Sequence, residues 1–194
     1  MKNLLAALIM SLSLSAAGDT LPGKAYAAHT TQHFPREVFW GDTHVHTNLS
    51  FDASYLSDST LGPEDAYRFA KGEAVTTYGG FTAKLSRPLD FLVVADHAIN
   101  MGVVKAIRDN DPAVNATEKG RQWASRFHQI YDDDPERPLK HLRLLADIWL
   151  QGPLEQNTIL RSTWEQAIQL ADNHNTPGHF TAFIGYEWTA LFNL

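Results

Sequence analysis

The sequence predicts an α/β fold built on parallel strands, and three observations point to it. Short runs of β-branched and aromatic residues alternate with segments of helical periodicity along the chain. One run, Leu89 to Ala95, is apolar apart from Asp90, which is typical of a strand inside a parallel sheet. The chain has 194 residues, 44% hydrophobic and 20% charged, which suits one globular domain or part of a larger one.

Local sequence patterns predict the first two strands and the helix between them. Residues 38–40 and 43–47 predict a strand because aromatic and β-branched residues concentrate there. Gly62-Pro63-Glu64-Asp65 opens a helix, since proline fits the first helical position and the acids meet the positive end of the helix dipole. Gly72 ends this helix. Residues 89–95 are expected as a second strand, buried on both faces.

Helices are expected between the second strand and a third. Apolar residues recur at helical spacing in residues 115–131, and residues 139–150 predict another helix. Ser162-Thr163-Trp164-Glu165 is a capping box for a helix that runs toward Asn173. Residues 180–188 predict the third strand.

Residues 1–27 are expected to be a secretory signal peptide. Lys2 precedes an uncharged, mostly apolar stretch that is short for a membrane span, and Ala25-Tyr26-Ala27 offers a cleavage site. A cut near Ala17, an uncleaved anchor and a buried helix are the alternatives. Residues 28–37 are expected to form a flexible leader before the domain at 38–194. We expect an exported protein, periplasmic or secreted, with no stable membrane anchor after signal cleavage.

The composition excludes several function classes. No cysteine is present, so disulfides, thiolate zinc sites and cysteine nucleophiles are excluded. The net charge of −6 argues against a nucleic-acid partner, which a basic surface would favour. Nine histidines remain, unevenly distributed along the chain.

The first candidate site residues follow the first strand. His44 and His46 are two apart, so they point to one face of a strand and can bind one metal ion together. Asp52 arrives from the next loop, where its carboxylate could complete the site, and Asp42 is a candidate partner behind the ligands. The alternative is a pair of ordinary surface or core histidines.

Two further candidates end the other predicted strands. Asp96-His97 follows the apolar run, at the carboxyl end where ligands gather in parallel α/β folds. We predict His97 as a ligand and Asp96 as its orienting or loop-fixing partner; a helix-capping Asp beside an incidental His is the alternative. Glu187 closes the third strand, and Gly185 leaves room on the same face for an ion or another backbone. Taken alone, Glu187 is also consistent with an exposed strand end.

Several strings resemble a known family. Residues 39–47 with Ser50-Phe51-Asp52 resemble the first motif of the polymerase and histidinol phosphatase (PHP) superfamily. Residues 65–72, 85–91 and 183–189 resemble an exported bacterial branch of it, described only as a domain of unknown function. The resemblance implies a distorted (β/α)7 barrel with two or three divalent metal ions at its C-terminal mouth.

The resemblance also implies a role for each ligand. His44 and His46 match the histidines of the first metal, and Glu187 matches a carboxylate that bridges two metals. Asp52 and His97 match ligands of a further metal. Histidine and carboxylate donors suit zinc, manganese or iron.

The function that the resemblance implies is hydrolysis of phosphoesters. Family members of known activity mostly use a metal-bound water as the nucleophile, so we expect an exported metal-dependent phosphoesterase with a small, phosphorylated substrate. No catalytic side chain is assigned beyond that water. A non-catalytic, degenerate metal-binding protein and an amidohydrolase-like metal enzyme acting on C–N bonds are the alternatives.

The length is the main departure from the family. Its members continue past the third motif and supply further histidines and a late Asp-x-His, whereas this chain ends seven residues after Glu187. We expect a partial barrel that lacks its C-terminal strands, with a helical insertion between His97 and Glu187. We also expect weak metal binding and low turnover.

Overall fold

The computed structural model describes residues 37–56, 60–130, 134–154 and 158–188. Residues 1–38 and 39–194 form two separate units, and the architecture below is that of the second. The expected signal peptide at 1–27 lies outside the described residues, as does the leader up to residue 36. Of the helices in the described ranges, none is long and apolar enough to cross a membrane.

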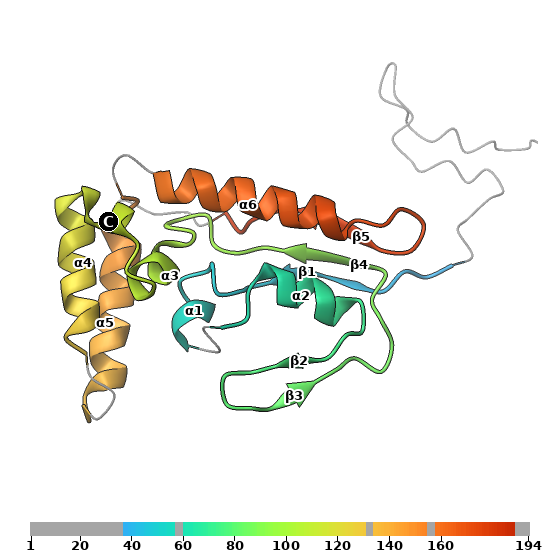
Figure 1. The fold of residues 1–194 in the computed structure, drawn as a ribbon, viewed down its shortest axis with the longest axis horizontal. Coiled ribbons are helices and arrows are strands. Elements are labelled where there is room, and N and C mark those ends of the chain that lie inside the picture. The colour runs from blue at the N-terminus through green and yellow to red at the C-terminus, as the bar shows by residue number, and fades with distance from the viewer. Residues whose placement is uncertain (1–36, 57–59, 131–133, 155–157, 189–194) are drawn as a thin grey trace, which may run out of the picture. The chain divides into compact units, whose positions relative to one another are not determined.

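A small parallel sheet lies at the centre of a mixed α/β fold (Figure 1). Its strands are β1 (Gly41–Val45), β4 (Phe91–Val94) and β5 (Thr181–Ile184), in the order β1-β4-β5. Both pairs are parallel. The predicted α/β class with parallel strands is therefore confirmed.

One face of the sheet is covered by two helices. The helix α2 (Pro63–Ala70) begins at the predicted proline, and Gly72 follows its end with a φ of 82°. Together with α6 (Thr158–His174), α2 packs on the face that carries Leu92 and Val94.

The opposite face of β4 is only partly buried. Phe91 and Val93 point to this face, and no described helix packs on it. The prediction that this strand is buried on both faces is therefore wrong for the part of the chain that the structure describes.

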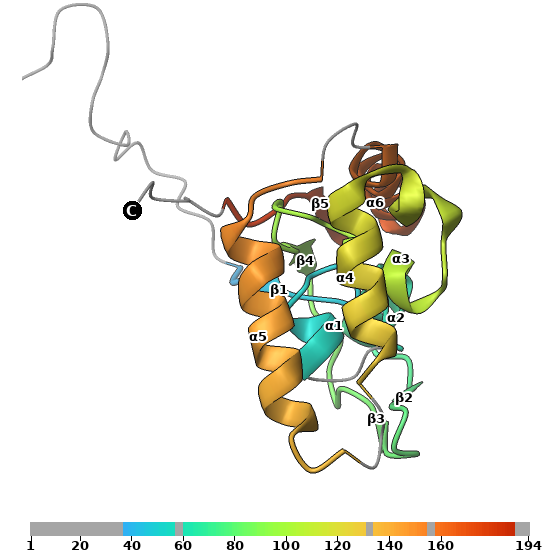
Figure 2. The same cartoon turned by 90° about the vertical axis from the view of Figure 1, so that its left-hand side faces the viewer.

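The expected helical insertion lies between β4 and β5. It contains α3 (Val103–Arg108), the 3-10 helix η1 (Pro112–Ala116), α4 (Glu118–His128), α5 (Arg137–Leu150) and α6. In Figure 2, α4 and α5 lie side by side. One hydrophobic core lies between the sheet and the helices α2 and α6, and a second lies among the helices of the insertion. The most buried members of the second core are Val103, Ile107, Trp123, Leu144 and Ile148.

The start of α6 differs from the prediction. The helix already begins at Thr158, so Ser162 lies inside it and caps nothing. The Ser162 hydroxyl instead donates to the backbone carbonyls of Thr158 and Ile159, within the helix's own first turns.

The sequence prediction missed α3, η1 and three further short elements. The strands β2 (Val75–Thr76) and β3 (Thr82–Ala83) form an antiparallel hairpin, and α1 (Ala53–Leu56) is a single turn. The hairpin had a signal, because Gly79-Gly80 lies between β-branched residues and Gly80 adopts a φ of 80°.

Candidate metal centre

The ends of the three parallel strands bring the predicted ligands to one edge of the sheet. His44 lies in β1 and His46 directly follows it. Beyond β4 and β5, His97 and Glu187 face each other in an isolated parallel bridge. The Ala98 amide donates to the Glu187 carbonyl at 3.0 Å, so the parallel pairing continues past the strands and holds both ligands in register.

Glu187 contacts both histidines of β1. Its Oε2 lies 3.0 Å from Nε2 of His44 and 2.8 Å from Nε2 of His46. The two rings stack with their centroids 4.9 Å apart. These three side chains form a group that could hold a metal ion, which we call the first group.

The hydrogen bonding of His46 leaves one ring nitrogen for a cation in the first group. Its Nδ1 lies 2.9 Å from Oδ2 of Asp52, which favours the tautomer whose Nδ1–H donates to the carboxylate. The buried Nε2 then carries a lone pair and makes no hydrogen bond, although Glu187 is 2.8 Å away. Two electron-rich atoms at this separation repel each other unless a proton or a metal ion lies between them. Two ligand atoms bound to a tetrahedral zinc ion at about 2.0–2.2 Å lie about 3.3–3.6 Å apart, so these atoms need to separate by only a few tenths of an ångström to hold one.

His46, Asp52 and His97 form a second group that could hold a metal ion. Nε2 of His97 lies 3.6 Å from Oδ2 of Asp52, and its Nδ1 lies 3.6 Å from Oε2 of Glu187. The structure therefore brings all five predicted ligands together. It also places His46 in both groups, which spacing along the chain could not indicate.

Asp52 is held as a carboxylate. Burial alone raises its pKa, but hydrogen bonds from the Ser50 hydroxyl, the His46 ring and the Ala53 amide outweigh burial and lower the pKa. The anionic form is the one that binds a metal ion.

His97 is held as a neutral imidazole. Burial lowers its pKa, although the carboxylates of Asp52 and Glu187 act in the opposite direction. Its ring stacks on Phe51 at a centroid distance of 4.7 Å. A neutral imidazole is the form that binds a metal ion.

Asp96 and Asp42 hold the backbone around the ligands. The buried Asp96 accepts hydrogen bonds from the Thr47 amide at 2.5 Å and the Thr47 hydroxyl at 2.8 Å, and so ties the loop after His46 to the end of β4. Burial raises the pKa of Asp96, and the hydrogen bonds from Thr47 act against it. Asp42 is exposed and accepts from the His44 amide at 2.8 Å.

Gly185 has no side chain, and the space beside it holds the side chain of Val93. A Cβ at this position would lie 2.5 Å from Cγ1 of Val93 on β4, so the predicted space for an ion or another backbone is filled by that methyl group. The glycine lets β5 approach β4 just before Glu187.

We expect Gly185→Ala to destabilise the fold by about 1–3 kcal/mol, because the added methyl overpacks this contact. Urea denaturation measures the loss. Adding Val93→Ala should recover part of it, since the clashing methyl is removed. Losses that simply add in the double variant would contradict the overpacking.

Outside the two groups, three of the other described histidines pack against aromatic rings. His174 lies 2.8 Å from the Glu64 carboxylate and stacks on Tyr67. His128 and His141 pack against Phe127. His29 and His33 lie outside the described residues.

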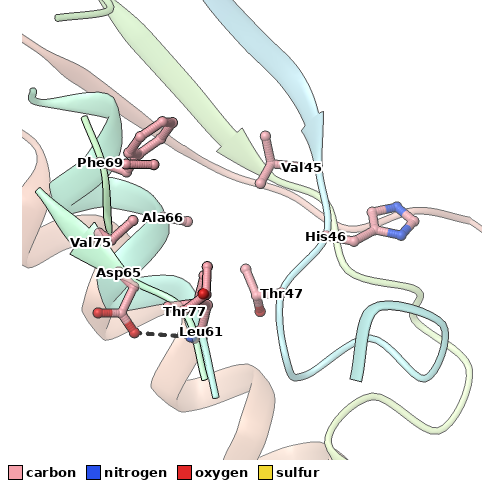
Figure 3. A pocket seen from close by; sticks show the side chains of 11 residues that line it. Val45, His46, Thr47, Leu61, Asp65, Ala66, Phe69, Val75 and Thr77 are labelled. Carbon is pink, nitrogen blue, oxygen red and sulfur yellow. Dashed lines mark hydrogen bonds between the residues drawn. The ribbon is translucent and has the colours of Figure 1, made fainter. Parts of the chain in front are cut away.

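An apolar pocket of about 260 Å³ lies between β1, α2 and the hairpin. In Figure 3, Val45 points toward Ala66 and Phe69 across this pocket, whereas the ring of His46 points away from it. The pocket and the ligand groups therefore lie on different sides of the chain at the end of β1.

One family model matches the chain over residues 33–193, and its description is "Protein of unknown function (DUF3604)". Comparison with curated proteins and with solved structures gave no match.

Proposed function

The chain belongs to the DUF3604 family of proteins of unknown function, and we propose that it is a metal-dependent hydrolase of phosphoesters, built on part of a distorted (β/α)7 barrel of the PHP type. The observation that carries the proposal is Nε2 of His46, which is buried without a hydrogen bond 2.8 Å from a carboxylate oxygen. A divalent cation satisfies both atoms.

The ligand groups suit phosphoester chemistry. Divalent ions held by imidazoles and carboxylates supply Lewis acidity and neutralise charge on phosphoryl oxygens. Zinc, manganese and iron all accept this donor set. Glu187 would serve both ions, because its Oε2 lies within 3.6 Å of a ring nitrogen of His44, His46 and His97.

The site is open on the His44 side. The His44 side chain is 64% exposed, whereas those of His46 and His97 are 15% and 13% exposed. A small phosphorylated substrate would therefore approach past His44, while the other two histidines form the floor of the site. Asp96 holds the loop after His46 through the Thr47 amide. Asp52 orients the ring of His46 through a hydrogen bond.

The test combines metal analysis with hydrolysis. We expect the purified chain to take up zinc or manganese and to hydrolyse simple phosphate mono- or diesters, with loss of activity on chelation and recovery on metal addition. Hydrolysis that persists in chelator would contradict the proposal. Metal uptake without any turnover would support a non-catalytic metal-binding protein, and cleavage of C–N bonds alone would support an amidohydrolase-like enzyme.

A further inference from the structure

A pocket of about 390 Å³ lies between α6 and the segments that follow β4 and β5, and we call it the α6 pocket. The residues that line it are Ala98, Met101, Leu160, Arg161, Trp164 and Tyr186. Ala98 directly follows the predicted ligand His97, and Tyr186 directly precedes Glu187, in two segments that pair as parallel backbone. Neighbouring side chains on extended backbone point to opposite faces, so the α6 pocket lies on the side of these segments away from the metal ligands.

Apolar and aromatic side chains form most of the α6 pocket. Met101 is buried, whereas Tyr186 is 48% exposed. The rings of Trp164 and Tyr186 meet edge to face, with centroids 5.6 Å apart and planes at 86°. Two rings at this angle form a corner. A flat ring in such a corner can stack on the face of one aromatic residue and contact the edge of the other.

Arg161 brings a positive charge to the α6 pocket. Its side chain is exposed, and it makes no ion pair or hydrogen bond within the part of the chain that the structure describes. Glu165 lies one turn further along α6, at a spacing that allows an ion pair, but the described residues show none between them. A planar guanidinium matches a carboxylate with two parallel hydrogen bonds. Among the described residues, no other charged side chain lines the pocket, so its chemistry fits a single negative charge.

We propose that the α6 pocket is a binding site for an aromatic carboxylate, whose ring lies in the corner of Trp164 and Tyr186 and whose carboxylate pairs with Arg161. Small-molecule sites are typically about 300–1,000 Å³, with apolar walls and a few polar groups that fix orientation, and the α6 pocket has both properties. The chain carries a net charge of −6, which repels anions in general, so the local charge of Arg161 is what admits this one. The site needs no metal ion and is separate from the proposed hydrolase centre.

The test measures binding of 2-naphthoate to the full chain by calorimetry after metal ions are removed with a chelator, because a carboxylate could otherwise bind a metal ion at the ligand groups. 2-Naphthamide is the neutral probe of nearly the same shape. We expect wild type to bind 2-naphthoate about tenfold more tightly than 2-naphthamide, and Arg161→Gln to reduce this ratio to about one. Arg143→Gln should keep the ratio. It is the matched control, because Arg143 is an exposed arginine of α5 that also makes no ion pair within the described residues.

Trp164→Leu tests the aromatic corner. We expect it to weaken both probes by about twofold to tenfold and to leave their ratio unchanged, because stacking does not depend on the charge of the probe. Circular dichroism of each variant confirms that α6 is folded. Equal binding of the two probes by wild type, or a ratio that Arg161→Gln does not change, would overturn the proposal. Equally tight binding of decalin-2-carboxylate would also overturn it, since a saturated ring does not stack. Binding of 2-naphthoate that appears only after zinc is added would place the carboxylate at the metal ligands and likewise overturn it.

Discussion

Replacing Glu187 by glutamine is expected to lower zinc affinity by at least about a hundredfold. Loss of a partner behind a metal ligand costs about 10–100-fold, and Glu187 is a predicted ligand that contacts three histidines. The amide that replaces the carboxylate has no charge to balance a divalent ion. The lone pair of His46 then faces a neutral group, and one ion loses its central anion.

Competition with a chromophoric chelator measures this effect, with metal content after dialysis as a second readout. Glu64→Gln is the matched control, because Glu64 also lies 2.8 Å from a histidine nitrogen, that of His174, but outside both ligand groups. We expect Glu64→Gln to bind zinc like wild type and His44→Ala to bind it more weakly. Equal metal content in wild type, Glu187→Gln and His44→Ala would refute the ligand assignment.

The positions of the candidate ligands were predictable because short-range rules place them. Residues two apart on a strand share a face, which pairs His44 with His46, and the carboxyl ends of parallel strands meet at one edge, which adds His97 and Glu187. The helix at Pro63 was predictable for the same reason, since its start and end depend on adjacent residues.

Features set by distant contacts were not predictable. The hydrogen bond from His46 to Asp52 selects a tautomer, but chain spacing carries no information about ring orientation. The contact between Phe51 and Trp149 joins a loop and a helix 98 positions apart, and only packing of the insertion creates it. The prediction that β4 is buried on both faces was wrong, because a continuous apolar run does not say which face of the strand a helix covers.

Asn100→Ala is expected to cost about 3–4 kcal/mol of unfolding free energy. Asn100 is 1% exposed and lies in the loop that joins β4 to the insertion. Its amide donates to the carbonyls of Ile148 and Gly152 at 2.9 and 3.2 Å, and its oxygen accepts from the Leu154 amide at 3.0 Å. Alanine leaves these backbone groups buried without partners, and each such group costs about 1–3 kcal/mol before the structure relaxes.

The backbone of Asn100 adds a second cost, which a matched control separates. Asn100 has a φ of 53°, and Asn110 has a φ of 58° but is exposed. Asn110→Ala should therefore lose the conformational part, about 1 kcal/mol, and one exposed hydrogen bond to the Arg108 carbonyl, which water can replace. Glycine tolerates positive φ, so Asn110→Gly should be close to neutral while Asn100→Gly still loses the buried hydrogen bonds.

Urea denaturation of the four variants gives the comparison. Equal losses at the two positions would show that backbone strain, and not the buried amide, explains the effect. A larger loss at Asn100 would assign the effect to its amide contact with the end of α5, where Ile148 lies. Asn100 then holds the end of α5 against the loop after β4.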